Sequence, residues 1–183
     1  MRLKAKQTRY VAAKIGIDLA NADFATMPKG KEAVVEACKM IIDANLEQER
    51  KLDAKVEEML DDNYDEIEFQ QVKERELFFM IKKRLAPEFG VIMNYDDRYN
   101  EVSHLILDEL YENYLLEYEV NDNQIRNIIF KGFKAFSDAY DKMDDKVYEQ
   151  IQNMGKEYVP GSVEYELLYE RLYEDELKRR GML

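Results

Sequence analysis

A single histidine limits the metal chemistry open to this chain. His104 follows Glu101 in a Glu-x-x-His spacing, which puts both side chains on one face of a helix. Helical di-iron sites use that spacing, but they need two such motifs and two further glutamates. The sequence has no second histidine. We therefore expect no metal site here and interpret His104 as a polar residue beside an apolar helix stripe.

Other residue types that could do chemistry lack the partners they need. Cys38 lies on the apolar side of a predicted helix, with no histidine near it in sequence, which favours a buried, inert thiol. The acidic run from Asp61 to Glu68 resembles a calcium loop, but Glu66 stands in place of the glycine and Val72 in place of the closing glutamate. The sequence contains no glycine-rich phosphate loop and no Gly-x-Ser-x-Gly motif. We predict no catalytic, metal-binding or cofactor-binding residue, because the 39 carboxylates are too abundant for any pair to stand out.

Tyrosine is the residue type whose pattern most suggests contact with a partner. The chain has 13 tyrosines and no tryptophan, and tyrosines recur every four residues near its end. Tyrosine is enriched at protein interfaces, but the same stripe could instead pack internally against another helix. Two Arg-Tyr pairs, Arg9-Tyr10 and Arg98-Tyr99, allow the same two interpretations, a structural role or contact with a partner. The candidate partner surface comprises Arg9, Tyr10, Arg98, Tyr99, Tyr165, Tyr169, Tyr173, Lys178, Arg179 and Arg180.

These residues sit in a sequence that repeats itself. KLDAKVEEML at residues 51–60 matches KMDDKVYEQI at residues 142–151 in five of ten positions, at an offset of 91 residues. The Arg-Tyr pairs, and Glu76-Leu-Phe-Phe79 with Glu166-Leu-Leu-Tyr169, match at nearly the same offset. A repeat of this period indicates one supersecondary unit used twice. The alternative is a single six-helix domain in which the matching segments are similar only because their compositions are alike.

The positions of apolar residues predict the elements of each unit. Steps of three and four predict six helices, at about residues 5–21, 30–62, 72–86, 96–114, 122–154 and from Ser162 to about Arg180. The fifth helix has a narrow apolar seam close to coiled-coil spacing. Alternation over residues 116–120 allows a short strand.

We therefore predict an all-α fold of two tandem three-helix units, each short-long-short, at residues 1–90 and 91–183. Each unit is too small to bury both faces of its long helix alone. We expect the two long helices to pair about a pseudo-two-fold axis in one compact body, with at most minor β structure in the linkers.

The C-terminal half carries a recognisable sequence, YVPGSVEYELLYERLYEDELKRRGM at residues 158–182. With the Met-Arg-Leu start, Arg98-Tyr99 and Lys142-Met-Asp-Asp-Lys-Val147, the chain resembles the bacterial domain of unknown function 507 family, in a two-unit form. The resemblance covers essentially the whole chain and implies no activity. The first unit has Phe69-Gln70-Gln71 where the second has Pro160-Gly161-Ser162.

Charge narrows the class of partner. The net charge is −12, and residues 1–90 contribute −2 whereas residues 91–183 contribute −10. An acidic protein repels phosphate backbones, so we expect a non-enzymatic helical protein that binds another protein through a basic surface on that partner. The alternative is a nucleic-acid- or ribosome-associated factor that uses Arg2, Lys4, Lys6, Arg9 and Lys14. An enzyme of an unfamiliar helical type is the least favoured hypothesis.

Three expectations concern the setting of the protein. One cysteine fits a reducing cytoplasm. Lys14 and Asp18 interrupt the apolar region behind the basic start, so we expect no signal peptide, and no stretch is long and apolar enough to span a membrane. A two-unit chain could mimic a dimer of single units, so a monomer is favoured and a homodimer is the alternative.

Overall fold

A computed structural model describes residues 3–62, 74–155, 158–160 and 162–182 of the 183-residue chain. The described part is all-α apart from two strands of two residues each, which confirms the predicted fold class. The elements are η1 (Ala5–Gln7), α1 (Thr8–Ala20), β1 (Ala25–Thr26), α2 (Lys31–Asp61), α4 (Glu74–Leu85), η2 (Ala86–Phe89), α5 (Tyr95–Glu112), β2 (Glu117–Tyr118), α6 (Asp122–Gln152) and α7 (Val163–Arg179).

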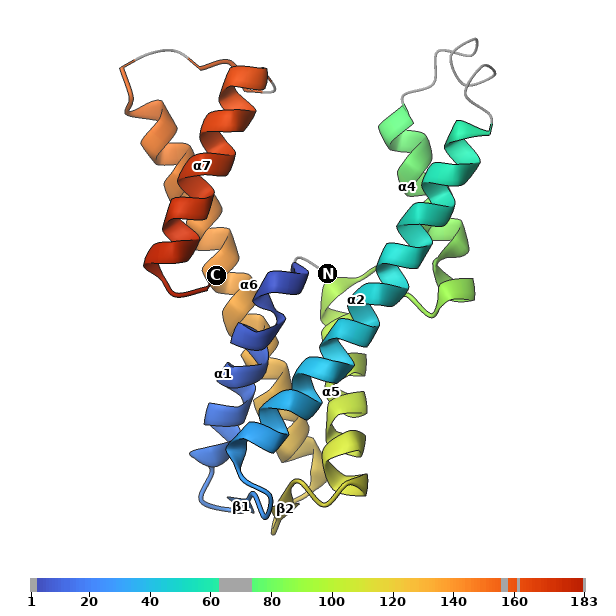
Figure 1. Cartoon of the computed structure of the whole chain (residues 1–183), viewed down its shortest axis with the longest axis vertical. Helices are drawn as coiled ribbons and strands as arrows, with labels where there is room; N and C mark the ends of the chain where they lie inside the picture. The colour runs from blue at the N-terminus through green and yellow to red at the C-terminus, as the bar shows by residue number, and fades with distance from the viewer. Residues whose placement is uncertain (1–2, 63–73, 156–157, 161, 183) are drawn as a thin grey trace.

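Four helices form a body at one end of the molecule (Figure 1). The shorter helices α1 and α5 each contact both long helices, α2 and α6. The strands pair antiparallel, with Ala25 opposite Tyr118 and Thr26 opposite Glu117, and close the base of the body. The structure thus differs from the expected direct pairing, because the two long helices are joined largely through α1 and α5.

Each long helix continues beyond the body as one side of a two-helix arm (Figure 1). At 1.5 Å per residue, a helix of 31 residues is roughly 46 Å long. The helix α4 packs along the outer half of α2, and α7 packs along the outer half of α6. We call these pairs the α2–α4 arm and the α6–α7 arm. They diverge in a V, and the N-terminal segment lies near the point of divergence.

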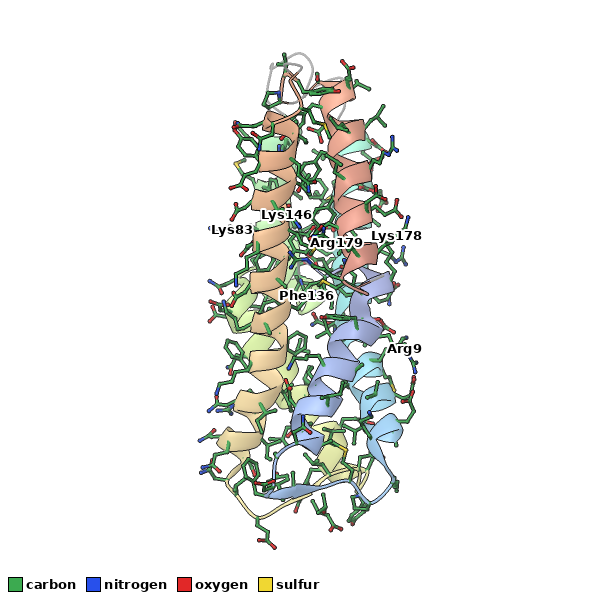
Figure 2. The ribbon with its side chains drawn as sticks, turned by 90° about the vertical axis from the view of Figure 1, so that its left-hand side faces the viewer. Arg9, Lys83, Phe136, Lys146, Lys178 and Arg179 are labelled. Atoms are coloured by element: carbon green, nitrogen blue, oxygen red, sulfur yellow. The ribbon has the colours of Figure 1, made fainter. Side chains whose placement is uncertain are left out.

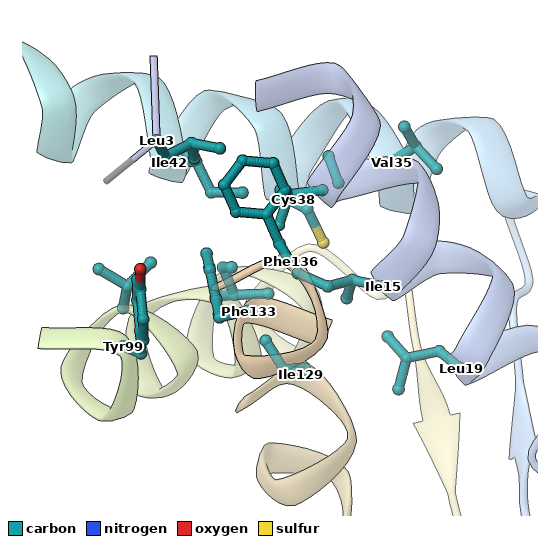
Figure 3. Packing of buried hydrophobic residues seen from close by; sticks show 14 of the residues in the cluster. Leu3, Ile15, Leu19, Val35, Cys38, Ile42, Tyr99, Ile129, Phe133 and Phe136 are labelled. Atoms are coloured by element: carbon teal, nitrogen blue, oxygen red, sulfur yellow. The ribbon is translucent and has the colours of Figure 1, made fainter. Parts of the chain in front are cut away.

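The body and the α6–α7 arm share one hydrophobic core. Ile15, Ile42 and Phe133 meet at its centre, and the single cysteine, Cys38, is fully buried beside them (Figure 3). The same cluster extends along the α6–α7 arm to Leu177. The α2–α4 arm instead has a smaller, separate cluster of Leu52, Val56, Leu60, Ala86 and Val91. The two arms are therefore anchored to the body differently.

Two glycines allow α1 to approach the long helices closely. A Cβ atom added at Gly16 would lie 2.6 Å from Cγ2 of Val35 on α2. One added at Gly132 on α6 would lie 2.7 Å from Cγ1 of Ile15. Both distances are shorter than carbon atoms tolerate in a packed core, so any larger residue would push the helices apart.

Helix ends agree with the predicted signals where the structure describes them. The Ser162 side chain accepts a hydrogen bond from the backbone N–H of Tyr165 at 3.2 Å and caps α7, as predicted. Asn94 and Asn121 cap α5 and α6 in the same way, although the sequence analysis did not identify them. The start of the third predicted helix, most of the acidic run and residues 69–71 lie outside the described residues.

The order of short helix, strand, long helix and short helix occurs twice along the chain, and both long helices contain 31 residues. The order of the helices, short-long-short, is the one that the sequence repeat predicts, whereas the strand in the first half was not predicted. The division into units at residues 1–90 and 91–183, and a two-fold relation between them, stay predictions. None of the described helices has a stretch long and apolar enough to cross a membrane.

Candidate interaction surface

The tyrosines selected by their spacing form a stack along α7. The ring centroids of Tyr165 and Tyr169 lie 6.3 Å apart with planes 18° from parallel, and those of Tyr169 and Tyr173 lie 5.8 Å apart at 15°. The stack continues onto α6, where the Tyr140 ring lies 5.2 Å from that of Tyr173. We call these four residues the tyrosine ladder.

The ladder packs partly against α6, as the internal interpretation of the stripe expects. The Tyr169 hydroxyl donates a hydrogen bond to Oδ1 of Asp144, and burial together with this carboxylate raises the pKa of Tyr169. Tyr173 is only 7% exposed, and burial together with the neighbouring Tyr140 hydroxyl raises the pKa of Tyr173. Tyr140, Tyr165 and Tyr169 are half-buried, so part of each ring remains accessible.

A row of glutamates runs beside the ladder. Each tyrosine of the α7 stripe is followed directly by a glutamate, at positions 166, 170 and 174. Consecutive helical residues project about 100° apart, so these exposed carboxylates form a second row. Within the described residues Glu166 and Glu170 make no ion pair, and Glu174 lies 3.6 Å from Nζ of Lys178. We call the three the glutamate row.

The two rows border a groove. Its volume is about 350 Å³, and it is lined by the glutamate row, by Tyr140, Tyr169 and Tyr173 of the ladder, and by Lys4 and Lys6 of the N-terminal segment. We call it the α7 groove. Its walls combine accessible aromatic rings with carboxylates, which is a surface suited to cationic groups.

A larger groove of about 940 Å³ lies along α2 and shares Lys4 with the α7 groove. Its carboxylates are largely neutralised from within. Lys39 lies 2.6 Å from Asp43, and Arg50 lies 2.7 Å from Glu47. Of these two grooves, the α7 groove therefore has the larger share of carboxylates without an ion pair among the described residues.

Arg98 and Tyr99 lie in the interior, which removes them from the candidate surface. Arg98 is 1% exposed and donates from Nε to Oδ1 of Asn45 at 2.7 Å, from Nη2 to the Asn45 carbonyl at 3.0 Å and from Nη1 to Glu49 at 2.7 Å. The Tyr99 ring stacks on Phe133 at 5.2 Å. A guanidinium with these bonds joins α5 to α2 where the α2–α4 arm leaves the body.

Lys82 completes this buried ion cluster. Its Nζ atom lies 3.0 Å from Oε1 of Glu49 and 2.6 Å from Oδ1 of Asp53, so α4 is tied to α2 at the same level. Burial alone would raise the pKa of Glu49, but positive groups that include Arg98 and Lys82 lower it to about 2. We interpret the cluster as the structural joint of the α2–α4 arm.

Arg9 and Tyr10 are exposed, unlike the second Arg-Tyr pair. Arg9 is ion-paired with Glu32 and Glu36 at 2.5 and 2.6 Å on the outside of the body (Figure 2). Tyr10 is 37% exposed, and its ring lies 6.3 Å from Phe136. These two residues stay in the candidate surface, but they lie on the body and not in the α7 groove.

The basic end of α7 is organised around one buried carboxylate. Glu176 is 5% exposed and lies within 3.0 Å of Lys146, Arg179 and Arg180 (Figure 2). Burial raises the pKa of Glu176, but hydrogen bonds from these three cations outweigh it and lower the pKa to about 2. Arg179 and Arg180 therefore have a structural partner, whereas Lys178 pairs only loosely with Glu174.

His104 and Cys38, the residue types best suited to catalysis, have structural roles in this fold. His104 accepts a hydrogen bond from Nη1 of Arg126, with 2.8 Å between that atom and Nε2. Burial raises the pKa of the Cys38 thiol to about 12, which keeps it protonated and unreactive. The described residues contain no group of three or more His, Cys, Asp or Glu side chains placed to hold a metal ion.

The sequence analysis missed the glutamate row and named Lys4 and Lys6 only as candidate phosphate contacts. The row had a sequence signal, because the dipeptide Tyr-Glu recurs at positions 165, 169 and 173 with a four-residue spacing. The position of Lys4 and Lys6 beside α7 had no such signal, since only the folded chain brings the start of the chain against that helix.

One comparison with known proteins identifies a family. The model of a protein family described as protein of unknown function (DUF507) matches residues 1–182. No curated protein matches the chain.

Proposed function

The chain belongs to the DUF507 family, whose function is unknown, and from that premise we propose that it is a non-enzymatic protein that binds another protein through a basic surface on the partner. The observation that carries the proposal is the exposed glutamate row beside the tyrosine ladder. Glu166 and Glu170, which make no ion pair among the described residues, attract a basic surface over a distance set by the salt concentration. Tyrosine rings provide contact area once that surface has docked.

The distribution of charge supports this choice of partner. Residues 91–183, which include both helices of the α6–α7 arm, contribute −10 of the net charge of −12. Two of the five basic residues in residues 1–14 form ion pairs with carboxylates of the same chain. Arg9 is paired with two glutamates, and Lys14 lies 2.5 Å from Asp18. This disfavours the alternative in which these residues bind the phosphates of a nucleic acid.

The test is affinity capture of the tagged chain from its native cells, with and without nuclease, followed by mass spectrometry. Capture with the wild type is compared with capture by E166K/E170K/E174K, which reverses the glutamate row. A matched control, E101K/E112K/E119K, makes the same change of charge at exposed positions on α5 and beside β2. We expect one protein that survives nuclease, is retained by the control and is lost with the reversed row.

Two outcomes would contradict the proposal. Capture of nucleic acid or ribosomal proteins that disappears with nuclease would favour the basic N-terminal segment. Equal loss of the partner in both charge-reversed variants would mean that overall charge, and not this surface, governs binding.

We further propose that the protein is a monomer whose two halves take the place of a dimer. Light scattering at low micromolar concentration should then give a mass near 21.8 kDa. A mass of twice that value would support the homodimer.

A further inference from the structure

We propose that the α7 groove binds arginine side chains, presented by a helix of the partner protein on which arginine recurs every fourth residue. The inference rests on the proposed function and specifies the site and the chemistry that it recognises. It follows from three features of the groove: its rings, its carboxylates and the two lysines at its end.

The rings favour arginine over lysine. The ladder residues of α7 are stacked within 18° of parallel, and two of the groove residues, Tyr140 and Tyr169, are half-buried. A planar guanidinium can lie against such rings through both cation–π attraction and stacking, whereas a lysine ammonium is a strongly hydrated point charge. Rings held rigid by neighbouring rings lose little conformational freedom when they bind.

The carboxylates set the spacing of the ligand. The glutamate row repeats every four residues, which corresponds to about 6 Å along a helix axis. A partner helix with arginine at the same interval would place successive guanidinium groups opposite successive carboxylates. Each guanidinium can donate two parallel hydrogen bonds to a carboxylate, a geometry that an ammonium group cannot match.

The floor of the groove is closed by Tyr173. Tyr173 lines the groove and is 7% exposed, and its buried hydroxyl interacts with that of the neighbouring Tyr140. A ligand in the groove therefore meets the accessible parts of the rings and not this hydroxyl.

Lys4 and Lys6 line the end of the groove nearest the body. Neither side chain makes an ion pair among the described residues, so both charges act on whatever enters the groove. The two lysines repel a cationic ligand, so the ligand is expected to bind closer to Glu166 and Glu170. Removing these two charges should therefore strengthen binding, an effect opposite in sign to the loss of the glutamate row.

The test measures binding of a labelled peptide to the full chain by fluorescence anisotropy. The probe is a helix-forming peptide of about 16 residues with arginine at every fourth position on an alanine and glutamine background. A second peptide has lysine at those positions. The protein variants are E166Q/E170Q/E174Q for the row, K4Q/K6Q for the lysines, Y173F for the hydroxyl, and E101Q/E112Q/E119Q as the control with equal charge change.

We expect the arginine peptide to bind more tightly than the lysine peptide by about threefold or more. Loss of the glutamate row should weaken binding of the arginine peptide by about tenfold. Y173F should leave binding within about twofold of the wild type, because the hydroxyl that it removes is buried. K4Q/K6Q should tighten binding by about twofold, and the control should stay within about twofold of the wild type. Circular dichroism of each variant checks that the helices are intact.

Equal affinity for the two peptides, or equal weakening by the row variant and the control, would overturn the inference. If that occurs while the cellular partner is still lost with the reversed row, the proposed function stands and only the arginine chemistry fails. If no cellular partner depends on the row, the proposed function itself fails, whichever peptide binds.

Discussion

Arg9 and Arg98 begin the two copies of one Arg-Tyr pair, yet only Arg98 is buried in a hydrogen-bonded ion cluster. Replacing Arg98 with methionine roughly keeps side-chain volume but removes one of the cations that lower the pKa of Glu49. Breaking a buried charge pair is strongly destabilising. We expect Arg98→Met to lower the free energy of unfolding by about 3 kcal/mol, measured by urea denaturation.

Arg9→Met is the matched control for that substitution. Arg9 is exposed, and water screens its pairs with Glu32 and Glu36, so stability should change much less than with Arg98→Met. Equal losses from the two variants would show that the Arg98 cluster contributes no more than a surface pair.

Glu176 should make the free energy of unfolding depend on pH in the acidic range. Its pKa in the folded chain is about 2, below the ordinary value of 4.5. A carboxylate with a lowered folded pKa contributes stability that is full above the unfolded pKa and is lost as pH falls from about 4.5 towards 2. We expect Glu176→Gln to be less stable than the wild type at pH 6, with the difference shrinking towards pH 2.

Urea denaturation across this pH range measures that difference. Glu101→Gln is the control, because its carboxylate is exposed on the body and has no ion pair among the described residues. A gap between wild type and Glu176→Gln that stays constant with pH would contradict the assignment of the cations to Glu176.

Among the helices, the close contact of α1 with α6 depends on Gly132. Alanine is the better helix former by about 1 kcal/mol, so a helix in isolation would gain stability from Gly132→Ala. In the folded chain the new Cβ would lie 2.7 Å from Cγ1 of Ile15. We expect overpacking to outweigh propensity and to lower the free energy of unfolding by about 1–3 kcal/mol, measured by thermal or urea unfolding.

A double-mutant cycle separates the clash from other effects. Ile15→Ala removes the atoms that the new Cβ would meet, at the cost of a cavity. The double variant should be more stable than the sum of the two single losses indicates. If the losses of the two single variants simply add, the contact between residue 132 and Ile15 does not limit the spacing of α1 and α6.

For the molecule as a whole, the two arms should differ in local stability. The α6–α7 arm shares the core of the body, whereas the α2–α4 arm has a separate cluster around Leu52 and Val56. Segments with fewer core contacts open more often. We expect amide hydrogens of residues 75–85 to exchange faster than those of residues 165–177, measured by hydrogen exchange with mass spectrometry.

Two substitutions test whether the arms open separately. Leu52→Ala should accelerate exchange mainly within the α2–α4 arm, because its cluster is distinct from the main core. Ile42→Ala, in the main core of the body, should accelerate exchange throughout. Identical exchange maps for these two variants would indicate a single cooperative unit.

Features that depend on neighbours along the chain could be predicted from the sequence. Apolar spacing predicted the helices, the Ser162 cap and the all-α class, because helix periodicity and capping are local properties. The four-residue spacing of Tyr165, Tyr169 and Tyr173 likewise predicted that their rings would share one face of a helix, and they do.

Which of these residues face solvent depends on how the helices pack together, and it could not be predicted from the sequence. Two identical Arg-Tyr pairs ended in opposite environments, because burial depends on the helices packed around each pair and not on the pair itself. The α7 groove arises where Lys4 and Lys6, from the start of the chain, meet a helix near its end. Contacts between segments so far apart in sequence leave no local pattern, since they are set by the packing of the whole core.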